Sequence, residues 1–324
     1  MYRYVKSPIF VRYLHQMEKI LRIGTRDSEL AMWQAKKVQS LLENLGYTTT
    51  LVPVKSQGDL TLDIPLYEMG ITGVFTKVLD VAMLQGHIDI AVHSMKDVPT
   101  ALPKGIVKGA VLERANVQDV LVYKDNLDFL SCEQATIATG SLRRKAQWLK
   151  RFPTHKVENL RGNIATRLHK LQEQPWQGAI FAAAALERLQ KDSLQTLVLD
   201  WMTPAPAQGA IMSVAMAHDS YTLEALAQIN NPKADTETDI ERRFLKQLEG
   251  GCTAPIGARA TLEGEQISFV GNLFSLDGQR AVEIRKTISA HQIGNFPEES
   301  ADALLAQGGD ALMQEIRKAM NIQK

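Results

Sequence analysis

The strongest constraint in the sequence is a repeated alternation of short apolar segments with longer segments of helical periodicity. Residues 20–23 read as a buried strand, and the apolar residues after Ser28 recur at the spacing of an amphipathic helix. Residues 48–54 are β-branched and predict a second strand, and 88–92 predict a third after a helix at 75–85. Such alternation favours a largely parallel sheet with helices on both faces.

A second run of the same kind begins near Ile137, with strands separated by helices at 143–150 and 164–172. Proline and glycine interrupt it at 203–209, which predicts a hinge or crossover. A helix at 236–248, short strands and a terminal helix follow. We therefore expect two doubly wound α/β domains and a smaller α+β C-terminal domain. The expected parts are an N-terminal extension at 1–18, domain 1 at 19–113 and 211–229, domain 2 at 117–205, and domain 3 at 232–324.

Composition excludes several classes of protein. The 324 residues have a formal net charge of +1, so the molecule as a whole is not built to coat nucleic acid or acidic lipid, and any positive field must be local. The two cysteines, Cys132 and Cys252, lie far apart, which argues against a disulfide framework and fits a reducing cytoplasm. The chain has no apolar run of about 18 residues and no signal-peptide core, so we expect no membrane span.

The first candidate for chemistry is the segment 91–99, which begins within the third predicted strand. Open α/β sheets bind ligands at the carboxyl ends of their strands, and Lys96 and Asp97 stand there on a turn restrained by Pro99. A carboxylate in this place could transfer protons or stabilise a developing cation. The alternative is a surface turn whose charges face water. His93 is better explained as a core residue than as a catalyst.

A dispersed set of arginines is the second candidate. Several stand at predicted helix starts, where free N–H groups and the positive end of the helix dipole favour an anion. Arginine also forms bidentate contacts with carboxylates and phosphates. The set, with two serines, comprises Arg26, Ser28, Arg114, Ser141, Arg143, Arg144, Arg161, Arg167 and Arg188. Arginines that are solvated or paired with acidic residues are the alternative.

The third candidate is Cys252, which follows Gly250 and Gly251. The glycines permit a loop with positive φ, and a thiol on it could be a nucleophile or an attachment point. A small buried hydrophobic residue is the alternative, and Cys132 is left as structural. The sequence contains no His/Cys cluster with metal-ligand spacing, so we expect no metal site. It also contains no dinucleotide-binding or phosphate-loop glycine motif.

Taken together, these segments resemble the porphobilinogen deaminase family from about Ile20 to the C-terminus. The segments that carry the resemblance are 91–99, 141–144, 160–162, 208–210 and 249–252, and they occur in the family's order. The resemblance implies that the first two domains are similar to periplasmic solute-binding proteins. It also implies that the third domain carries the cofactor cysteine.

The resemblance also implies a reaction: a transferase condenses four porphobilinogen molecules, with loss of ammonia, into the linear tetrapyrrole hydroxymethylbilane. A dipyrromethane cofactor held by a thioether to Cys252 serves as the primer, and Asp97 matches the catalytic carboxylate. The matching cofactor-binding residues are Lys96, Ser141, Arg143, Arg144, Arg161 and Gly162, and the substrate-binding residues are Arg26, Ser28, Arg114, Arg167 and Arg188. We expect a cytoplasmic monomer with porphobilinogen as its small-molecule partner and no nucleic acid or membrane.

The chain departs from the family's pattern at a few positions. It has Gly70-Ile71-Thr72-Gly73 where a flexible segment often carries a lysine, and Val78 where an acidic residue is common. Gln118 and Gly140 replace a common arginine and serine. These departures concern lid closure and some carboxylate contacts, and they leave Asp97 and Cys252 in place.

Two other functions fit part of the pattern. A non-catalytic two-domain protein with an arginine-lined cleft could bind a carboxylate, but it gives Cys252 no role. A nucleic-acid binder would use arginines on phosphates, but the near-zero net charge and the lack of interleaved aromatic and basic residues argue against it.

Overall fold

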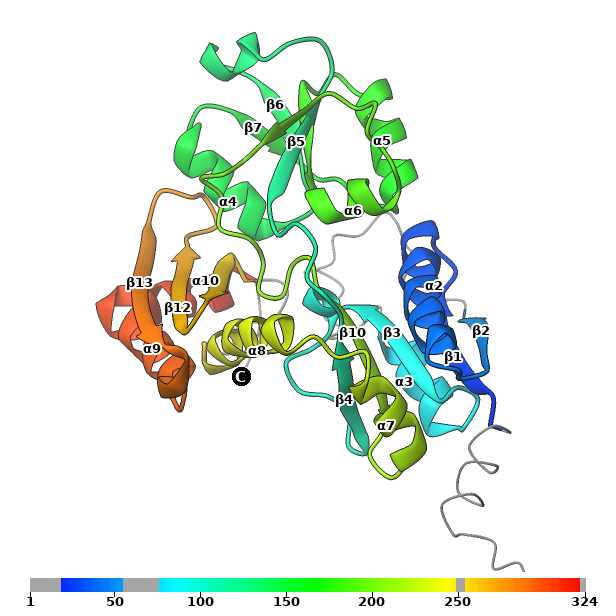
Figure 1. The fold of residues 1–324 in the computed structure, drawn as a ribbon. Coiled ribbons are helices and arrows are strands. Elements are labelled where there is room, and N and C mark those ends of the chain that lie inside the picture. Colours follow the sequence, from blue (N-terminus) through cyan, green and yellow to red (C-terminus); the bar gives the residue numbers. More distant parts are fainter. Residues whose placement is uncertain (1–18, 55–75, 249–253, 321–324) are drawn as a thin grey trace, which may run out of the picture.

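A computed structural model describes residues 19–54, 76–248 and 254–320 (Figure 1). Residues 70–73 and Cys252 lie outside the described residues. Three sheets, each with its own helices, make up the described chain, and they occupy three separate regions of Figure 1. In the part that is described, no helix is long and apolar enough to cross a membrane.

The first sheet has five strands in the order β2-β1-β3-β10-β4. These are β1 (Leu21–Arg26), β2 (Thr49–Val54), β3 (Ile90–Ser94), β4 (Ile106–Val111) and β10 (Ile211–Met216). Only β10 runs against the others. Helices α2 (Glu29–Asn44) and α7 (Ser220–Ala227) cover one face, and α3 (Lys77–Leu84) packs on the other. The Ser28 side chain caps α2 by accepting from the Ala31 N–H, as a serine before an amphipathic run predicts.

The second sheet repeats this plan in the order β7-β6-β8-β5-β9. Its strands are β5 (Asp119–Tyr123), β6 (Thr136–Ala138), β7 (Lys156–Glu158), β8 (Gly178–Ala182) and β9 (Thr196–Val198). Its helices are α4 (Leu142–Arg151), α5 (Ile164–Glu173) and α6 (Ala183–Arg188). In each sheet the antiparallel strand is the one that the chain enters after crossing from the other sheet, β5 after β4 and β10 after β9. The proline-rich segment 203–209 lies in the second crossover, as the sequence predicts.

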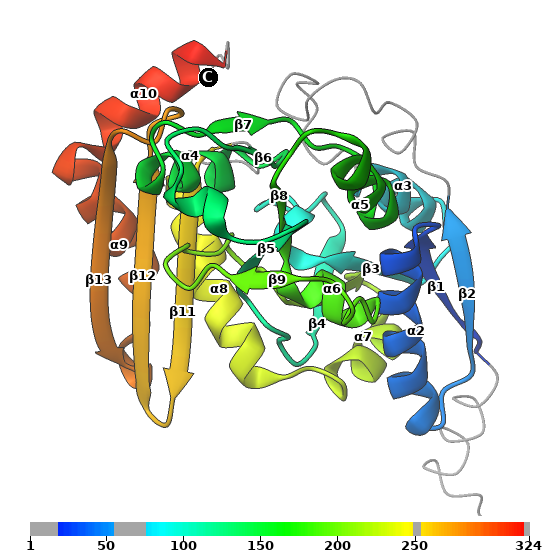
Figure 2. The ribbon, with the colours of Figure 1, turned by 90° about the horizontal axis from the view of Figure 1, so that it is seen from above.

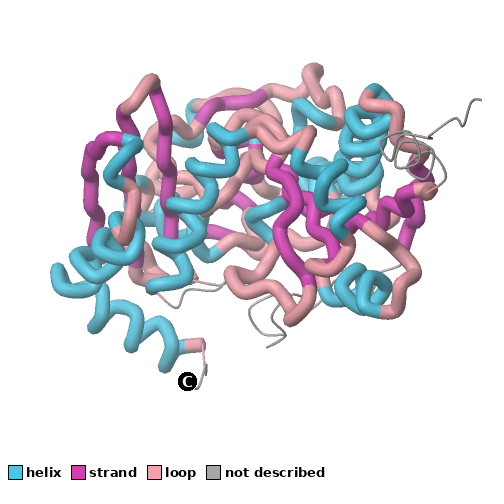
Figure 3. The backbone as a smooth tube through the Cα atoms, turned by 60° about the horizontal axis from the view of Figure 1, so that its bottom comes forward, coloured by secondary structure: helices cyan, strands magenta, loops and turns pink. Residues whose placement is uncertain are grey.

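The third sheet is an antiparallel meander of β11 (Ile256–Glu263), β12 (Gln266–Phe274) and β13 (Ala281–Ser289). Helices α8 (Pro232–Gln247), α9 (Phe296–Leu304) and α10 (Asp310–Ala319) gather on one side of it (Figures 2 and 3). Phe244 of α8 and Phe269 of β12 meet edge to face in the core between the layers. The predicted fold class, two doubly wound α/β units and a smaller α+β unit, is confirmed, while the exact domain boundaries stay a prediction.

Some element predictions are wrong. The single helix expected at 300–320 is two helices, because Gly308 has φ 107°, which ends a right-handed helix. Helix α8 begins before residue 236, since Asn231 accepts from the Ala234 N–H and sets its start. Cys132, to which the sequence gives no chemical role, is exposed. The sequence pattern also does not single out β4, β5, β9, β10 or β13.

Candidate active site

Asp97 lies at the carboxyl end of β3, the central strand of the first sheet, as the sequence predicts. The strand passes into a short 3-10 turn, Met95–Asp97, in which Lys96 and Asp97 are half-buried. The turn is fixed from outside its own sheet. Arg242 of α8 donates to the carbonyls of Met95 (3.2 Å), Val98 (2.9 Å) and Pro99 (2.6 Å). The third unit therefore helps to hold the catalytic candidate in place.

Arg143 and Arg144 stand in the first turn of α4, where the Ser141 hydroxyl caps the helix. Both are almost fully buried, with 4% and 6% of their surface exposed. They share the carboxylate of Asp119: Arg143 Nη1 lies 2.7 Å from Oδ2, and Arg144 Nη2 and Nε lie 2.8 and 3.0 Å from Oδ1. Arg143 Nη1 also donates to the carbonyl of Thr203, 2.8 Å away. These two arginines form a buried ionic cluster at the base of the predicted anion site.

Arg161 and Arg167 flank the start of α5 in the same unit. Arg167 Nε donates to the carbonyl of Gly162 (2.7 Å), a residue whose φ of 113° suits only glycine. Burial first, and then the charges of Arg144 and Arg161, lower the pKa of Arg167 to about 10, while Asp97 acts in the opposite sense. The Asp97 carboxylate of the first sheet therefore lies close enough to affect the charged groups of the second.

Lys96 connects the first sheet with the ionic cluster of the second. Its Nζ donates to Oε1 of the buried Gln208 at 3.2 Å, and Gln208 Nε2 donates to Asp119 Oδ1 at 2.9 Å. Burial first and then Arg144 lower the pKa of Lys96 to about 8, with Arg143 adding to this and Asp97 and Asp119 opposing it. Through Gln208, Lys96 of the first sheet is thus linked to Asp119 of the second sheet, the carboxylate that binds Arg143 and Arg144.

The remaining predicted residues make contacts of their own. Arg26 ends β1, and its charge, after burial, lowers the pKa of the buried His93 to about 4. Ser28 is occupied in capping α2. Arg188, at the end of α6, donates to the carbonyl of Gly209 at 2.7 Å, and its guanidinium stacks over the Trp33 ring with a centroid distance of 5.6 Å. Arg188 thus contacts the first unit from the second.

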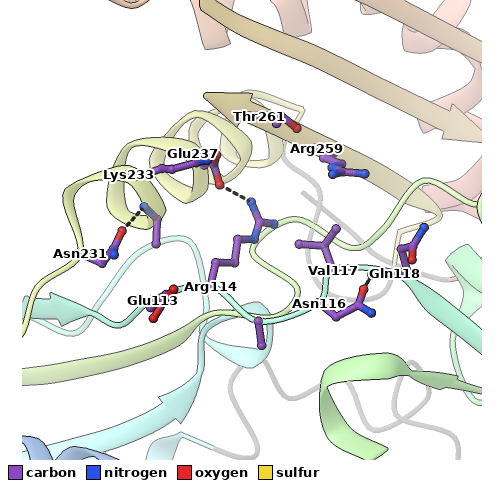
Figure 4. Close-up of a pocket in the computed structure, with 13 residues that line it drawn as sticks. Glu113, Arg114, Asn116, Val117, Gln118, Asn231, Lys233, Glu237, Arg259 and Thr261 are labelled. Carbon is purple, nitrogen blue, oxygen red and sulfur yellow. Dashed lines mark hydrogen bonds and ion pairs between the residues drawn. The ribbon is translucent and has the colours of Figure 1, made fainter. Parts of the chain in front are cut away.

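Arg114 is engaged by two acidic residues of α8. Its Nη1 and Nη2 lie 2.8 Å from the two oxygens of Glu241, and Glu237 is 3.5 Å away. It lines a cavity of about 530 Å³ between the crossover 113–118 and the third unit (Figure 4). Gln118, one of the departures from the family's pattern, lines this cavity as well.

Two polar residues of the cluster were missed in the sequence. Asp119 begins the apolar strand β5, and a lone carboxylate at the head of a buried strand is a signal that a partner is needed. Gln208 stands in a segment that carries the family resemblance, but its neighbours in space come from residues 96 and 119. Only the fold brings these together.

Family models match most of the chain. "Porphobilinogen deaminase, dipyromethane cofactor binding domain" matches residues 21–224, and "Porphobilinogen deaminase, C-terminal domain" matches residues 236–304. A porphobilinogen deaminase of Trichlorobacter lovleyi is 41% identical over 303 residues, which cover 92% of this chain and 97% of the relative. One of Desulfitobacterium hafniense is also 41% identical, over 302 residues, with the same coverage.

Solved structures with a low overall likeness include the VFT2 domain of Bordetella pertussis BvgS, at 11% identity. Its TM-score is 0.42, and the match covers 69% of this chain and 92% of that one. An ancestral cationic amino acid solute-binding protein reaches a TM-score of 0.41 at 17% identity, covering 71% of this chain and 97% of that one. The fold class rests on the described sheets and on the family models. The family models and the curated relatives together show that this chain belongs to the porphobilinogen deaminase family.

Proposed function

We propose that the chain carries out its family's reaction where the Asp97 turn of the first sheet meets the arginines of the second. The chain is a transferase of tetrapyrrole biosynthesis that condenses four porphobilinogen molecules, with loss of ammonia, into hydroxymethylbilane on a dipyrromethane cofactor. The observation that supports the assignment of residues is a chain of hydrogen bonds between the two sheets: Lys96, next to Asp97, donates to Gln208, which donates to the Asp119 carboxylate that binds Arg143 and Arg144. Cations arranged beside the half-buried Asp97 suit a polyanionic substrate with a cationic intermediate.

The described residues fit a dipyrromethane, whose two pyrroles carry four carboxylates. Arg143 Nε is buried and, within the described residues, has no hydrogen-bond partner. A buried donor of this kind is costly until an acceptor arrives. The residues proposed to hold the cofactor are Lys96, Ser141, Arg143, Arg144, Arg161 and Gly162, with Cys252 as the covalent attachment. When bound, the cofactor supplies the electron-rich pyrrole from which the product chain grows.

Asp97 is proposed as the catalytic carboxylate. Positive charge develops on porphobilinogen as ammonia leaves, and a fixed carboxylate stabilises that charge without reorganising. The same oxygens can accept the proton that the pyrrole releases after each condensation, a role worth about 10²–10⁴-fold in rate. The three hydrogen bonds from Arg242 hold the turn that carries Asp97 in place for this role.

The substrate-binding set is proposed as Arg26, Ser28, Arg167 and Arg188. Each pyrrole brings two carboxylates, which guanidinium groups bind with directional, charge-assisted hydrogen bonds. Arg114 is left out of this set, because both of its Nη atoms are engaged by the buried Glu241. We also propose a cytoplasmic monomer that needs neither nucleic acid nor membrane, which the net charge of +1 supports.

The experiment compares intact masses and porphobilinogen consumption of the wild type with Cys252→Ser and Asp97→Ala. The wild type should exceed its sequence mass by one dipyrromethane. Cys252→Ser should fold without the added mass and without turnover, since the thiolate is the reactive nucleophile near neutral pH. Asp97→Ala should keep the cofactor site but lose about 10²-fold or more in rate.

Two results would contradict these assignments. An active wild type at the bare sequence mass would remove Cys252 as the attachment residue. A loss of less than about tenfold in Asp97→Ala would move the catalytic role to another group.

A further inference from the structure

Asp119 makes an unusual number of contacts for a residue outside the predicted site. It is fully buried at the start of β5, and its two oxygens accept from Arg143, from Arg144 and from the Gln208 amide. Although burial acts to raise it, the charges of Arg143 and Arg144 hold the pKa of Asp119 well below its usual range. It is therefore a permanent negative charge inside the molecule.

The two arginines depend on this charge. Arg143 and Arg144 are adjacent in the first turn of α4, where the positive end of the helix dipole disfavours cations. After burial, Asp119 is the main charge that acts on Arg143, and it raises the arginine's pKa while Arg144 lowers it. Without the carboxylate, two buried like charges would face each other at a helix N-terminus.

Asp119 also reaches the other side of the site through Gln208. The Gln208 amide donates to Asp119 Oδ1 (2.9 Å) and to the Val117 carbonyl (2.7 Å), so its Oε1 is turned toward Lys96 Nζ at 3.2 Å. The flanking backbone fixes this arrangement. A Cβ on Gly209, where φ is 86°, would lie 2.6 Å from the Ala115 carbonyl oxygen.

We propose that Asp119 is a positioning residue for the reaction. It holds Arg143 and Arg144 for the cofactor carboxylates, and through Gln208 it holds the Lys96 ammonium beside Asp97, so that one buried carboxylate aligns the cations of both sheets. This rests on the proposed roles of those three cations. Asp119 itself contacts neither substrate nor cofactor.

The test measures the protonation of Lys96 directly, because it needs no turnover. Trace acetylation of the holoenzyme at a series of pH values, followed by peptide mass spectrometry, gives the midpoint at which Lys96 becomes a neutral, reactive amine. The described residues, without the cofactor, lower the pKa of Lys96 to about 8, and the midpoint measured in the wild-type holoenzyme is the reference for every variant. The charges that set it are Asp97 and Asp119, which favour the ammonium, and Arg143 and Arg144, which disfavour it.

Removal of the Asp119 charge in Asp119→Asn should lower the midpoint by roughly one pH unit. Asp119→Glu, which keeps the charge, should stay close to the wild type. Gln208→Leu removes the Lys96 acceptor and should also lower the midpoint, and it decides the question if Asp119→Asn does not fold. Intact mass should show, in addition, that Asp119→Asn carries less cofactor, because Arg143 and Arg144 are no longer aligned.

Asp89→Asn is the matched control, since Asp89 is also a buried carboxylate at the head of a strand and is paired with Arg22 (2.8 Å) far from the site. It should lose stability without moving the Lys96 midpoint. An unchanged midpoint in Asp119→Asn or, where that variant is unfolded, in Gln208→Leu would overturn the proposal. An equal shift in Asp89→Asn would overturn it too, because the midpoint would then follow general loss of stability. The midpoint readings do not depend on porphobilinogen being the substrate.

Discussion

Replacement of Arg114 by leucine tests whether this arginine stabilises the fold or binds substrate. The guanidinium is 7% exposed and the Glu241 carboxylate 0%, and two hydrogen bonds of 2.8 Å join them. Arg114 Nε also donates to the Gln208 carbonyl at 3.0 Å. Although burial lowers it, the charges and hydrogen bonds of Glu241 and Glu237 raise the pKa of Arg114 above its ordinary value. The pair ties the crossover between the two sheets to α8 of the third unit.

The expected cost of Arg114→Leu follows from what is left behind. Removing one partner of a buried ion pair costs about 3–5 kcal/mol, because the other charge stays buried without compensation. Glu241 keeps the backbone N–H groups of Ala207 (2.6 Å) and Ala260 (2.8 Å), so we expect the lower end of that range, about 3 kcal/mol. With an unfolding entropy of about 2.1 cal/mol/K per residue over the 324 residues, that lowers the melting temperature by about 4 °C.

The assay is thermal and urea unfolding of Arg114→Leu, Glu241→Leu and the double variant, alongside steady-state kinetics. The double variant should lose less than the sum of the two single losses, since it removes both buried charges together. Arg22→Leu is the matched control, because the Arg22 side chain is 40% exposed in its pair with Asp89 and should contribute at most about 1 kcal/mol. A melting temperature within about a degree of the wild type, together with a raised KM for porphobilinogen, would refute this reasoning and return Arg114 to the substrate.

Two further predictions concern the second unit. Arg161→Leu and Arg167→Leu should each stall elongation at particular chain lengths, seen by intact mass as steps of one pyrrole unit, because different chain lengths place different carboxylates on these arginines; equal slowing of every step would contradict this. Gly140→Ser should destabilise the protein by about 1–3 kcal/mol in urea unfolding, because a Cβ at Gly140 would lie 2.5 Å from the Leu160 carbonyl oxygen. An unchanged free energy of unfolding would contradict this and show that the loop relaxes freely.

Local sequence patterns predicted the architecture where a periodic signal was strong. The cap at Ser28 and the break at 203–209 were both readable, since each depends on residues close in sequence. The break in the terminal helix was missed because glycine is tolerated inside a helical pattern, and only the observed φ of Gly308 shows that it ends one. Short strands such as β9 (Thr196–Val198) carry too few residues to show a period.

The candidate site was predictable in its residue types but not in its internal pairing. Arg143 and Arg144 stood out as basic residues at a helix start, and the structure places them there. Both arginines are buried against Asp119, which lies 24 residues before Arg143 and 25 residues before Arg144 in the chain. No pattern within one helix reports such a contact, so the sequence suggested an open anion-binding surface where the structure has a buried ionic cluster with one donor, Arg143 Nε, unused by the described residues.

This pairing explains how a chain of net charge +1 can handle a polyanion that grows at each step. An unopposed set of buried guanidinium groups would raise the free energy of the folded protein by mutual repulsion and desolvation. Asp119 removes part of that cost while leaving the cations in fixed directions, so the site is organised before any carboxylate arrives. Positive charge that Asp119 does not pair lies around Arg167, where burial first and then neighbouring arginines lower the arginine's pKa to about 10. A ligand carboxylate gains the most binding free energy beside a cation that has no carboxylate partner in the protein. Arg167 should therefore contribute more than Arg144 to the binding of an incoming pyrrole.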